Sequence, residues 1–254
     1  MHRSNQKMPT TTTHKGESIK ASYLELIIGP MYSGKTSKII EIYKQYTFCN
    51  IPAMVINHVW DTRYDATLLS SHNQVKIGCT QTMRLMDVFA QATDKDMPVV
   101  LINEGQFFDD LYEFVDGLLR DAAAKGHSKK IYVSGLDGDF ERKRFGHILD
   151  LIPLCDRVYK LTSICSQCRN GTEGIFSMRI TSEKEQTVVG SDNYIPVCRA
   201  CYENAHKGWC YIFRDWFEIY NLYRSMNEIW IRLLCLVIFE TSESNDNANK
   251  YLSP

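Results

Sequence analysis

The sequence has little net charge, no apolar stretch at its start and no hydrophobic run of membrane length. A formal net charge of -1 offers no bulk attraction to polyanions, and no local basic patch stands out, so we expect no nucleic-acid partner. Residues 1–20 are polar and lack the apolar core of a signal peptide, which predicts a disordered tail. The apolar run at residues 229–239 is about half the length that a bilayer requires, so we expect no membrane partner.

The nine cysteines are an odd number in a chain without a secretory signal, which argues against a disulfide framework. Four of them form two C-x-x-C pairs, Cys165 with Cys168 and Cys198 with Cys201. Two such turns offer four thiolates to one tetrahedral zinc, and a site with four protein ligands has no open position for catalysis. A redox C-x-x-C pair is the alternative, but the duplication favours a structural zinc ion.

The stretch Gly29–Thr36 (GPMYSGKT) fits the phosphate-loop pattern G-x-x-x-x-G-K-[ST]. An apolar run, residues 23–28, precedes it, and a helix-like pattern follows over residues 35–46. Glycines let successive backbone N–H groups turn toward a phosphate at the start of the helix, where Lys35 reaches the outer phosphates and Thr36 can ligate magnesium. The alternative, a glycine-rich turn without a ligand, explains neither the lysine nor the position of the motif between a strand-like and a helix-like segment.

Strand-like and helix-like segments alternate over residues 21–161, which predicts an α/β domain: a parallel sheet of the phosphate-loop NTPase type with helices on both faces. Expected strands are residues 23–28, 53–57, 99–102 and 131–134, and expected helices are 35–46, 83–92 and 111–125. Residues 158–161 are expected to lead out of this domain.

A second, zinc-ribbon-like domain with a loop that could act as a lid is expected over residues 162–208. The loop lies between the two C-x-x-C pairs and includes residues 186–194. Residues 209–254 form an extension whose structure the sequence does not predict. Its apolar part suits a helix that packs on this chain or on another subunit, and a helix that lies at a membrane surface is the alternative.

Polar residues follow two of the expected strands, where open α/β sheets hold their ligands. Asp61 and Arg63 come after the second strand, and Asn103 and Glu104 come directly after the strand at residues 99–102. In phosphate-loop enzymes an acidic residue at the latter position handles magnesium or the attacking group. Taken alone, Asp61 and Arg63 could also form a plain surface ion pair.

Together, the motifs resemble the zinc-containing, cytosolic-type thymidine kinases. They are GPMYSGKTS, DTRY, NEGQFF, LDGDFERKRFG, LIPLCDRVYKLTSIC, SEKEQTVVGSDNY and the two cysteine pairs, and they cover residues 23–202. The resemblance implies ATP-dependent phosphorylation of the thymidine 5′-hydroxyl to dTMP in nucleotide salvage. It also implies deoxyuridine as a second substrate, magnesium, structural zinc, a cytoplasmic location and a homotetramer.

The resemblance also assigns roles to residues, with Glu104 as the general base. The nucleotide side comprises Gly29, Pro30, Met31, Tyr32, Ser33, Gly34, Lys35, Thr36, Asp61, Arg63, Asn103 and Gln106. The nucleoside side comprises Met31, Leu136, Phe140, Ser177, Gln186, Thr187, Val188, Val189, Gly190 and Tyr194. Phe140 and Tyr194 would supply an aromatic wall, and backbone groups of residues 186–190, the family's lasso, would hydrogen-bond the thymine edge.

One position departs from the family pattern, which has Asp-Glu where this chain has Asn103-Glu104. An amide keeps a carbonyl acceptor but lacks the charge that a hard cation prefers, so we expect weaker magnesium binding or slower turnover. Two alternatives remain open on the sequence. One is an attenuated homologue that binds nucleosides without phosphorylating them, and the other is a phosphate-loop ATPase with a zinc-ribbon interaction module.

Overall fold

The computed structural model describes residues 21–61, 68–70, 75–183, 185–188 and 190–205 of the chain. The chain divides into two compact units, residues 1–199 and 200–254. The described part of the second unit, residues 200–205, is helical. The predictions for residues 1–20 and 209–254, and those for Arg63 and Val189, fall outside the described residues.

The centre of the first unit is a six-stranded parallel sheet with strand order β5-β2-β6-β7-β1-β8. Its strands are β1 (Tyr23–Ile28), β2 (Ala53–His58), β5 (Thr80–Thr82), β6 (Val99–Ile102), β7 (Lys130–Gly135) and β8 (Arg157–Lys160). All four residues of β6 are buried, as expected for a continuous apolar run inside a parallel sheet. The predicted α/β class is confirmed.

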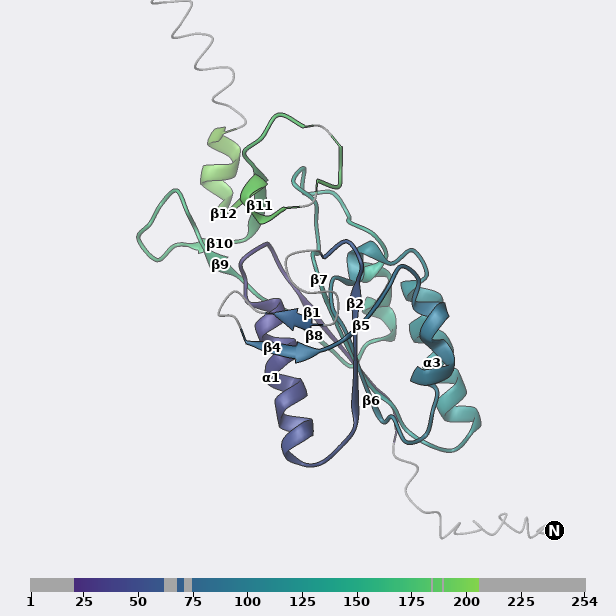
Figure 1. Ribbon diagram of the computed structural model, residues 1–254. Helices are drawn as coiled ribbons and strands as arrows, with labels where there is room; N and C mark the ends of the chain where they lie inside the picture. The colour runs from purple at the N-terminus through teal and green to yellow at the C-terminus, as the bar shows by residue number, and fades with distance from the viewer. Residues whose placement is uncertain (1–20, 62–67, 71–74, 184, 189, 206–254) are drawn as a thin grey trace, which may run out of the picture. The chain divides into compact units, whose positions relative to one another are not determined.

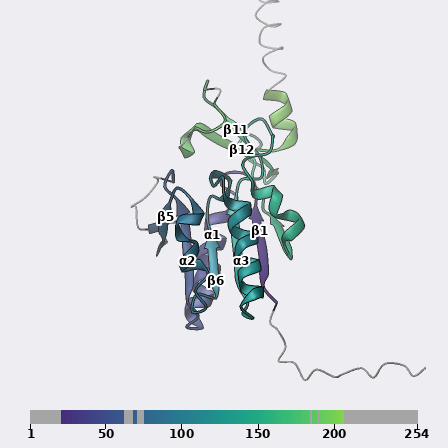
Figure 2. The ribbon, with the colours of Figure 1, turned by 90° about the vertical axis from the view of Figure 1, so that its right-hand side faces the viewer.

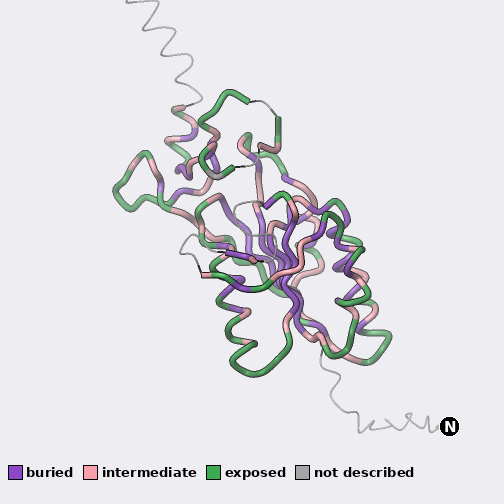
Figure 3. The backbone as a smooth tube through the Cα atoms, viewed as in Figure 1, coloured by how far each residue is buried: buried purple, intermediate pink, exposed green. Residues whose placement is uncertain are grey.

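Helices cover both faces of this sheet (Figure 1). Helix α1 (Lys35–Phe48) packs Ile39, Ile40 and Ile42 into the core on one face. Helix α3 (Leu111–Ala124) packs Phe114 and Leu118 into a separate core on the other face. The four inner strands, β1, β2, β6 and β7, are buried along most of their length (Figure 3). Two apolar layers therefore hold the carboxyl ends of the strands in a fixed arrangement.

The segment that was expected to be a helix over residues 83–92 is a 3-10 turn, η1 (Leu85–Val88), followed by the short helix α2 (Phe89–Ala92). The carboxylate of Asp110 accepts hydrogen bonds from the backbone N–H groups of Leu85 and Met86, which fixes where η1 starts. The rings of Phe89 and Phe114 meet edge to face, and α2 lies beside α3 (Figure 2).

The edge strand β8 was not predicted, since residues 158–161 were expected to lead out of the domain. Instead, Arg157–Lys160 pairs in parallel with β1, and Leu161 N–H continues the pairing by donating to Ile28. All four side chains of β8 are exposed, so the sequence carries no buried apolar pattern there. Backbone hydrogen bonds to β1 define this strand.

The remaining described elements are short. They are the strands β3 (Leu68–Ser70), β4 (Lys76–Gly78), β9 (Ser163–Ile164), β10 (Glu173–Gly174), β11 (Phe176–Arg179) and β12 (Tyr194–Val197), and the 3-10 turns η2 (Gly105–Phe107), η3 (Ile148–Leu154) and η4 (Ser191–Asn193). β9 pairs with β10 and β11 with β12, both antiparallel. Residues 180–193 join β11 to β12; this loop contains the expected lasso, and the whole loop is called the lasso below. None of the described helices is long and apolar enough to cross a membrane.

Candidate active site

The phosphate loop joins β1 to α1 and uses backbone conformations that favour glycine. Gly34, the N-cap of α1, has φ of 87°, and a Cβ at Gly29 would lie 2.5 Å from the carbonyl oxygen of Leu161. Lys35 Nζ donates a 2.7 Å hydrogen bond to the carbonyl oxygen of Pro30, so the ammonium is held inside the turn of the loop. The loop thus brings a cation and a helix N-terminus to one point.

A cleft lies along the phosphate loop and the carboxyl ends of the sheet strands, wholly within the first unit. It is lined by residues 31–37, Trp60, Asp61, Ser70, Glu104, Gln106, Phe107, Leu136, Gly138, Asp139, Phe140, Phe145, Ser177, residues 186–188, Gly190 and Tyr194. The cleft therefore brings together segments that are more than 160 positions apart in the sequence. Most of the predicted nucleotide-side and nucleoside-side residues line this one cleft. Gly29, Pro30 and Asn103 do not.

Glu104 lies at the carboxyl end of β6 with φ of 54° and ψ of 42°, a left-handed conformation that is uncommon outside glycine. Such a backbone costs on the order of 1 kcal/mol, and such conformations concentrate at functional sites. Gln106 Nε2 donates a 2.7 Å hydrogen bond to Glu104 Oε2, while Gln106 Oε1 accepts one from Leu136 N–H. The buried Gln106 amide thus holds the carboxylate against the cleft.

Asn103 lies beneath the cleft, almost fully buried, in a row of polar side chains. Its Oδ1 accepts a 2.9 Å hydrogen bond from Ser134 and lies 3.5 Å from the Thr36 hydroxyl, which donates to it. Its Nδ2 donates to Asn57 Oδ1 at 3.0 Å, and Asn57 Nδ2 donates to Asp61 Oδ2 at 3.1 Å. This row of hydrogen bonds connects Thr36 to the carboxylate of Asp61, which lines the cleft.

The other end of the cleft combines the phosphate loop with β11 and the lasso. Met31 N–H donates a 2.9 Å hydrogen bond to the Ser177 hydroxyl, so two residues predicted for the nucleoside side are in direct contact. The Tyr194 hydroxyl donates to the carbonyl oxygen of Val188, and Gln186 Nε2 donates to Asp139 at 2.7 Å. The lasso is therefore bonded both to its own hairpin and to the loop after β7.

Several cleft residues were not predicted. Trp60, Phe107 and Phe145 line the cleft, and Phe107 meets both other rings edge to face with centroids 5.7 Å apart. Each belongs to or adjoins a quoted motif, but a lone aromatic in a sequence is more often a core residue. Asn57 was also missed, because a single amide at the end of a strand matches no motif.

His58 is buried among these aromatic rings at the end of β2. Its ring lies 5.0 Å from that of Trp60 and 4.8 Å from that of Phe108, both edge to face. Burial lowers the pKa of His58 below its usual value, although nearby carboxylates, Asp109 and Glu104 foremost, partly oppose the shift. Its Nδ1 accepts a 3.1 Å hydrogen bond from the Trp60 N–H, as a neutral imidazole can.

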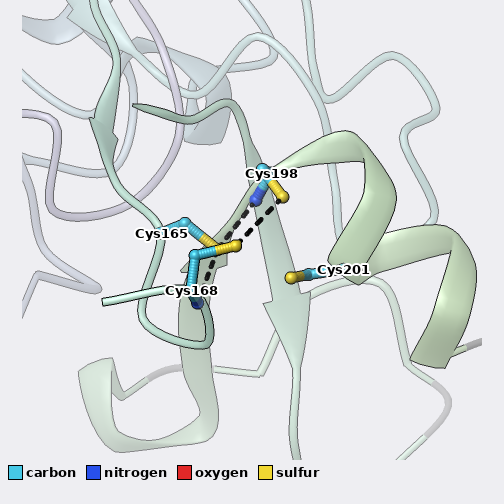
Figure 4. Close-up of side chains that lie close together, drawn as sticks. All are labelled: Cys165, Cys168, Cys198 and Cys201. Atoms are coloured by element: carbon cyan, nitrogen blue, oxygen red, sulfur yellow. Dashed lines mark hydrogen bonds between the residues drawn. The ribbon is translucent and has the colours of Figure 1, made fainter. Parts of the chain in front are cut away.

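The four cysteines of the two pairs lie together, as predicted (Figure 4). Their sulfur atoms are all within 4.8 Å of one another, and the sulfurs of Cys168 and Cys198 are 3.8 Å apart. Two thiolates on one tetrahedral zinc at about 2.3 Å would be separated by about 3.8 Å, so the arrangement fits this ion. All the cysteines that the structure describes are free of disulfides.

Backbone donors support a thiolate at this cluster. Burial is the largest influence on Cys165 and opposes its charged form. Even so, the combined hydrogen bonds to its sulfur, led by those of the Cys168 and Cys198 N–H groups, lower the pKa of Cys165 to about 6. Such N–H donors are the usual second layer around a zinc thiolate. The cluster could hold one structural zinc ion.

Comparison with known proteins places this architecture in a family. The thymidine kinase family model matches residues 22–202. The cytosolic thymidine kinase of Gallus gallus is 34% identical over 180 residues, which cover 70% of this chain and 76% of the relative. That of Bos taurus is 36% identical over 180 residues, covering 70% and 71%. The thymidine kinase of vaccinia virus (strain Western Reserve) is 37% identical over 185 residues, covering 72% and 98%. The chain belongs to the thymidine kinase family and is a phosphotransferase.

Proposed function

We propose that this protein transfers the γ-phosphoryl group of ATP to the 5′-hydroxyl of thymidine, giving dTMP and ADP, and accepts deoxyuridine as a second substrate. One observation carries the proposal: a single cleft holds the phosphate loop at one end and an aromatic wall with the lasso at the other, with Glu104 on its lining. The names of the relatives support thymidine as the acceptor. Salvage of DNA precursors is the corresponding role.

On the donor side, the backbone N–H groups of the phosphate loop and the Lys35 ammonium hold the ATP phosphates. Phosphoryl transfer depends mainly on alignment and charge stabilisation, so fixed donors at this point lower the barrier without covalent chemistry. Asp61 contributes a carboxylate to the same side. Arg63, which lies outside the described residues, is proposed from its motif to neutralise charge on the transferred group.

On the acceptor side, Glu104 removes the proton from the 5′-hydroxyl as the oxygen attacks phosphorus. A general base must lie within hydrogen-bond reach of the proton it takes, and the Gln106 amide restrains the carboxylate for this purpose. Phe140 and Tyr194 form the wall against which the base stacks, with Leu136 beside it. Backbone groups of residues 186–190 hydrogen-bond the edge of the thymine.

Two metal ions belong to the proposal. The Thr36 hydroxyl and the Asp61 carboxylate both line the cleft and offer the hard oxygen ligands that magnesium prefers. When bound, magnesium supplies positive charge that neutralises the phosphates during transfer. Cys165, Cys168, Cys198 and Cys201 would hold a structural zinc ion, whose binding stabilises the fold around the lasso hairpin.

The family resemblance also supports domain limits and an assembly. We assign residues 21–161 to the nucleotide-binding domain and 162–208 to the zinc and lasso domain, and we expect a homotetramer. Two relatives are named cytosolic, which supports a cytoplasmic location for this protein. Light scattering after gel filtration of the full chain measures the oligomeric mass directly, and a monomeric mass would contradict the tetramer.

The test is a phosphorylation assay with radiolabelled thymidine, ATP and magnesium, using the full chain and its Glu104→Gln variant. We expect labelled dTMP from the wild type and a severe loss in the variant. A wild-type protein that binds thymidine but makes no dTMP would instead support the attenuated nucleoside-binding homologue, a reading that Asn103 keeps open. ATP hydrolysis that polynucleotide stimulates and thymidine does not would support the ATPase alternative.

A further inference from the structure

Arg179 is the last residue of β11, where the chain leaves the hairpin and enters the lasso. Its guanidinium donates three hydrogen bonds to backbone carbonyl oxygens of the lasso. Nη1 donates to Glu183 at 2.9 Å and to Glu185 at 2.6 Å, and Nη2 donates to Gln186 at 3.2 Å. The planar fork of one side chain thus holds three carbonyls in the first half of the loop.

The same guanidinium also contacts the lasso indirectly, through Tyr194, the residue that pairs with Arg179 on β12. Arg179 Nη2 donates to the Tyr194 hydroxyl, and that hydroxyl donates onward to the carbonyl oxygen of Val188 at 3.2 Å. Because the hydroxyl accepts from a cation, its own hydrogen is directed at Val188. A fourth lasso carbonyl is therefore fixed indirectly.

Arg179 also packs against the two rings that form the aromatic wall of the cleft, Phe140 and Tyr194. Its guanidinium carbon lies 3.8 Å from the centroid of the Phe140 ring and 5.0 Å from that of Tyr194, within the range of cation–π attraction. Phe140 and Tyr194 line the cleft, whereas Arg179 is outside its lining. A second tie joins the same two parts, since Gln186 on the lasso donates to Asp139 beside Phe140.

From these contacts we infer that Arg179 is the positioning residue that joins the lasso and the aromatic wall into one preformed nucleoside-binding surface. It acts through Phe140, Tyr194 and the lasso backbone without touching the substrate. This inference rests on the proposed function where it concerns thymidine. The structural part of the inference, that Arg179 orders the lasso, does not depend on which ligand the cleft binds.

The chemistry calls for arginine at this position. A guanidinium presents several N–H donors in one plane and a flat face that stacks on rings, whereas the lysine ammonium is a compact point charge. Arg179→Lys keeps the charge but cannot supply the same set of donors and the stacking face together. Arg179→Met keeps an apolar stem of similar length and removes every donor. The two variants therefore separate charge from geometry.

Glu-C protease tests the structural half, because it cleaves after glutamate at the carbonyls of Glu183 and Glu185 that Arg179 holds. Neither substitution adds or removes a cleavage site. Without nucleoside, we expect cleavage at these two residues, mapped by mass spectrometry, to be on the order of tenfold faster in Arg179→Met than in wild type. Arg179→Lys should fall between them. Equal rates in all three proteins would overturn the inference.

Kinetics of the full chain test the half that concerns the substrate. We expect Arg179→Met to raise the KM for thymidine about tenfold while kcat and the KM for ATP stay within about twofold, with partial rescue by Arg179→Lys. The matched control is Arg157→Met, since Arg157 also bonds a tyrosine hydroxyl and lies over its ring, but does so on β8 at Tyr159. It should change neither readout.

The outcomes distinguish this inference from the proposed function. Faster cleavage with an unchanged KM for thymidine would overturn the positioning role toward the nucleoside. An equal rise in both KM values would also overturn it in favour of a general structural role. If wild type made no dTMP but Arg179→Met still exposed Glu183 and Glu185, the proposed function would fail and the ordering role of Arg179 would stand.

Discussion

Asn103 donates from Nδ2 to Oδ1 of Asn57 at 3.0 Å, which leaves the Asn57 amide nitrogen directed at Asp61, 3.1 Å away. Both amides are almost fully buried, and each fixes the orientation of the other. The family pattern has an aspartate where Asn103 lies, whereas here the row of bonds ends on the carboxylate of Asp61. Asp61, part of the DTRY motif, lines the cleft, so it is the charged member of this row at the proposed magnesium site.

The first prediction concerns Asn103→Asp. The new carboxylate should lower the magnesium concentration needed for half-maximal activity, because a charged oxygen binds a hard cation better than an amide does. It also places an acceptor against Asn57 Oδ1, which should reduce stability by about 1–3 kcal/mol. Magnesium titration of the activity and urea denaturation measure the two effects. Unchanged magnesium dependence and turnover would contradict the role assigned to the charge at this position.

Asn57 gives a second, isosteric test. Asn57→Asp replaces the donor to Asp61 with an acceptor, so two carboxylates would lie about 3 Å apart in a buried site. Asn57→Ala only removes the amide. We expect both substitutions to lower the unfolding free energy, and Asn57→Asp to lower it more above pH 6. As the pH falls and the two neighbouring carboxylates take up a proton, the difference between the variants should shrink. Denaturation curves from pH 5 to pH 8 measure this, and identical curves for the two variants would refute it.

The sequence predicted those parts of the fold that buried apolar periodicity determines. The bounds of β1 and β6 were predicted to the residue, because nearly every side chain in them is buried. It did not predict β8, whose side chains are exposed, or the short pair β3–β4. Strand β8 is specified by backbone pairing with β1, of which its own segment carries no trace. Strands β3 and β4 bury Leu69 and Ile77, but three residues are too few to show a period.

The candidate site divides in the same way. The phosphate loop, Glu104 and the two cysteine pairs have local patterns with a chemical reason for their spacing, so the sequence showed them. Asn57 and Arg179 have no such pattern, because their roles arise from contacts with segments 46 and up to 39 positions away, respectively. Such contacts depend on how the sheet and the hairpin fold. Only the structure brings them together.

A third prediction concerns the base. Glu104→Gln keeps the size of the side chain and an acceptor but removes the basic carboxylate, so kcat should fall by roughly 10²- to 10⁴-fold. Thymidine binding, measured by calorimetry without ATP, should change little, because the proposed contacts to the base lie elsewhere. Gln106→Ala removes the amide that orients the carboxylate and should reduce kcat less. A Glu104→Gln protein with near-normal turnover would exclude Glu104 as the base.

A fourth prediction concerns zinc. The purified full chain should contain about one zinc ion per chain, because four thiolates complete one tetrahedral site. Removing it with a chelator should lower the melting temperature and accelerate Glu-C cleavage in the lasso, whose hairpin lies between the cysteine pairs. Cys168→Ser should reduce the zinc content. Cys49→Ser, an exposed cysteine on no cluster, is the control and should leave it unchanged. Full zinc content in Cys168→Ser would refute the site.

The last prediction follows from the buried His58. Burial lowers its pKa in the folded protein below the ordinary value of 6.5, so the unfolded chain binds more protons between these two values. Stability therefore rises with pH in that window. The contribution of a neutral His58 is complete above pH 6.5 and is lost as the pH falls through the folded pKa, with a slope approaching about 1.4 kcal/mol per pH unit.

His58→Gln should remove this pH dependence, since glutamine can accept the Trp60 hydrogen bond and does not titrate. Urea denaturation from pH 5 to pH 8 gives the difference in unfolding free energy between wild type and variant. This difference should be constant above pH 6.5. Below pH 6.5 the unfolding free energy of wild type should fall relative to that of His58→Gln. His147→Gln is the matched control, because His147 is partly exposed and pairs with Asp150. If the difference between wild type and His58→Gln were flat across this range, His58 would not be held neutral by its aromatic surroundings.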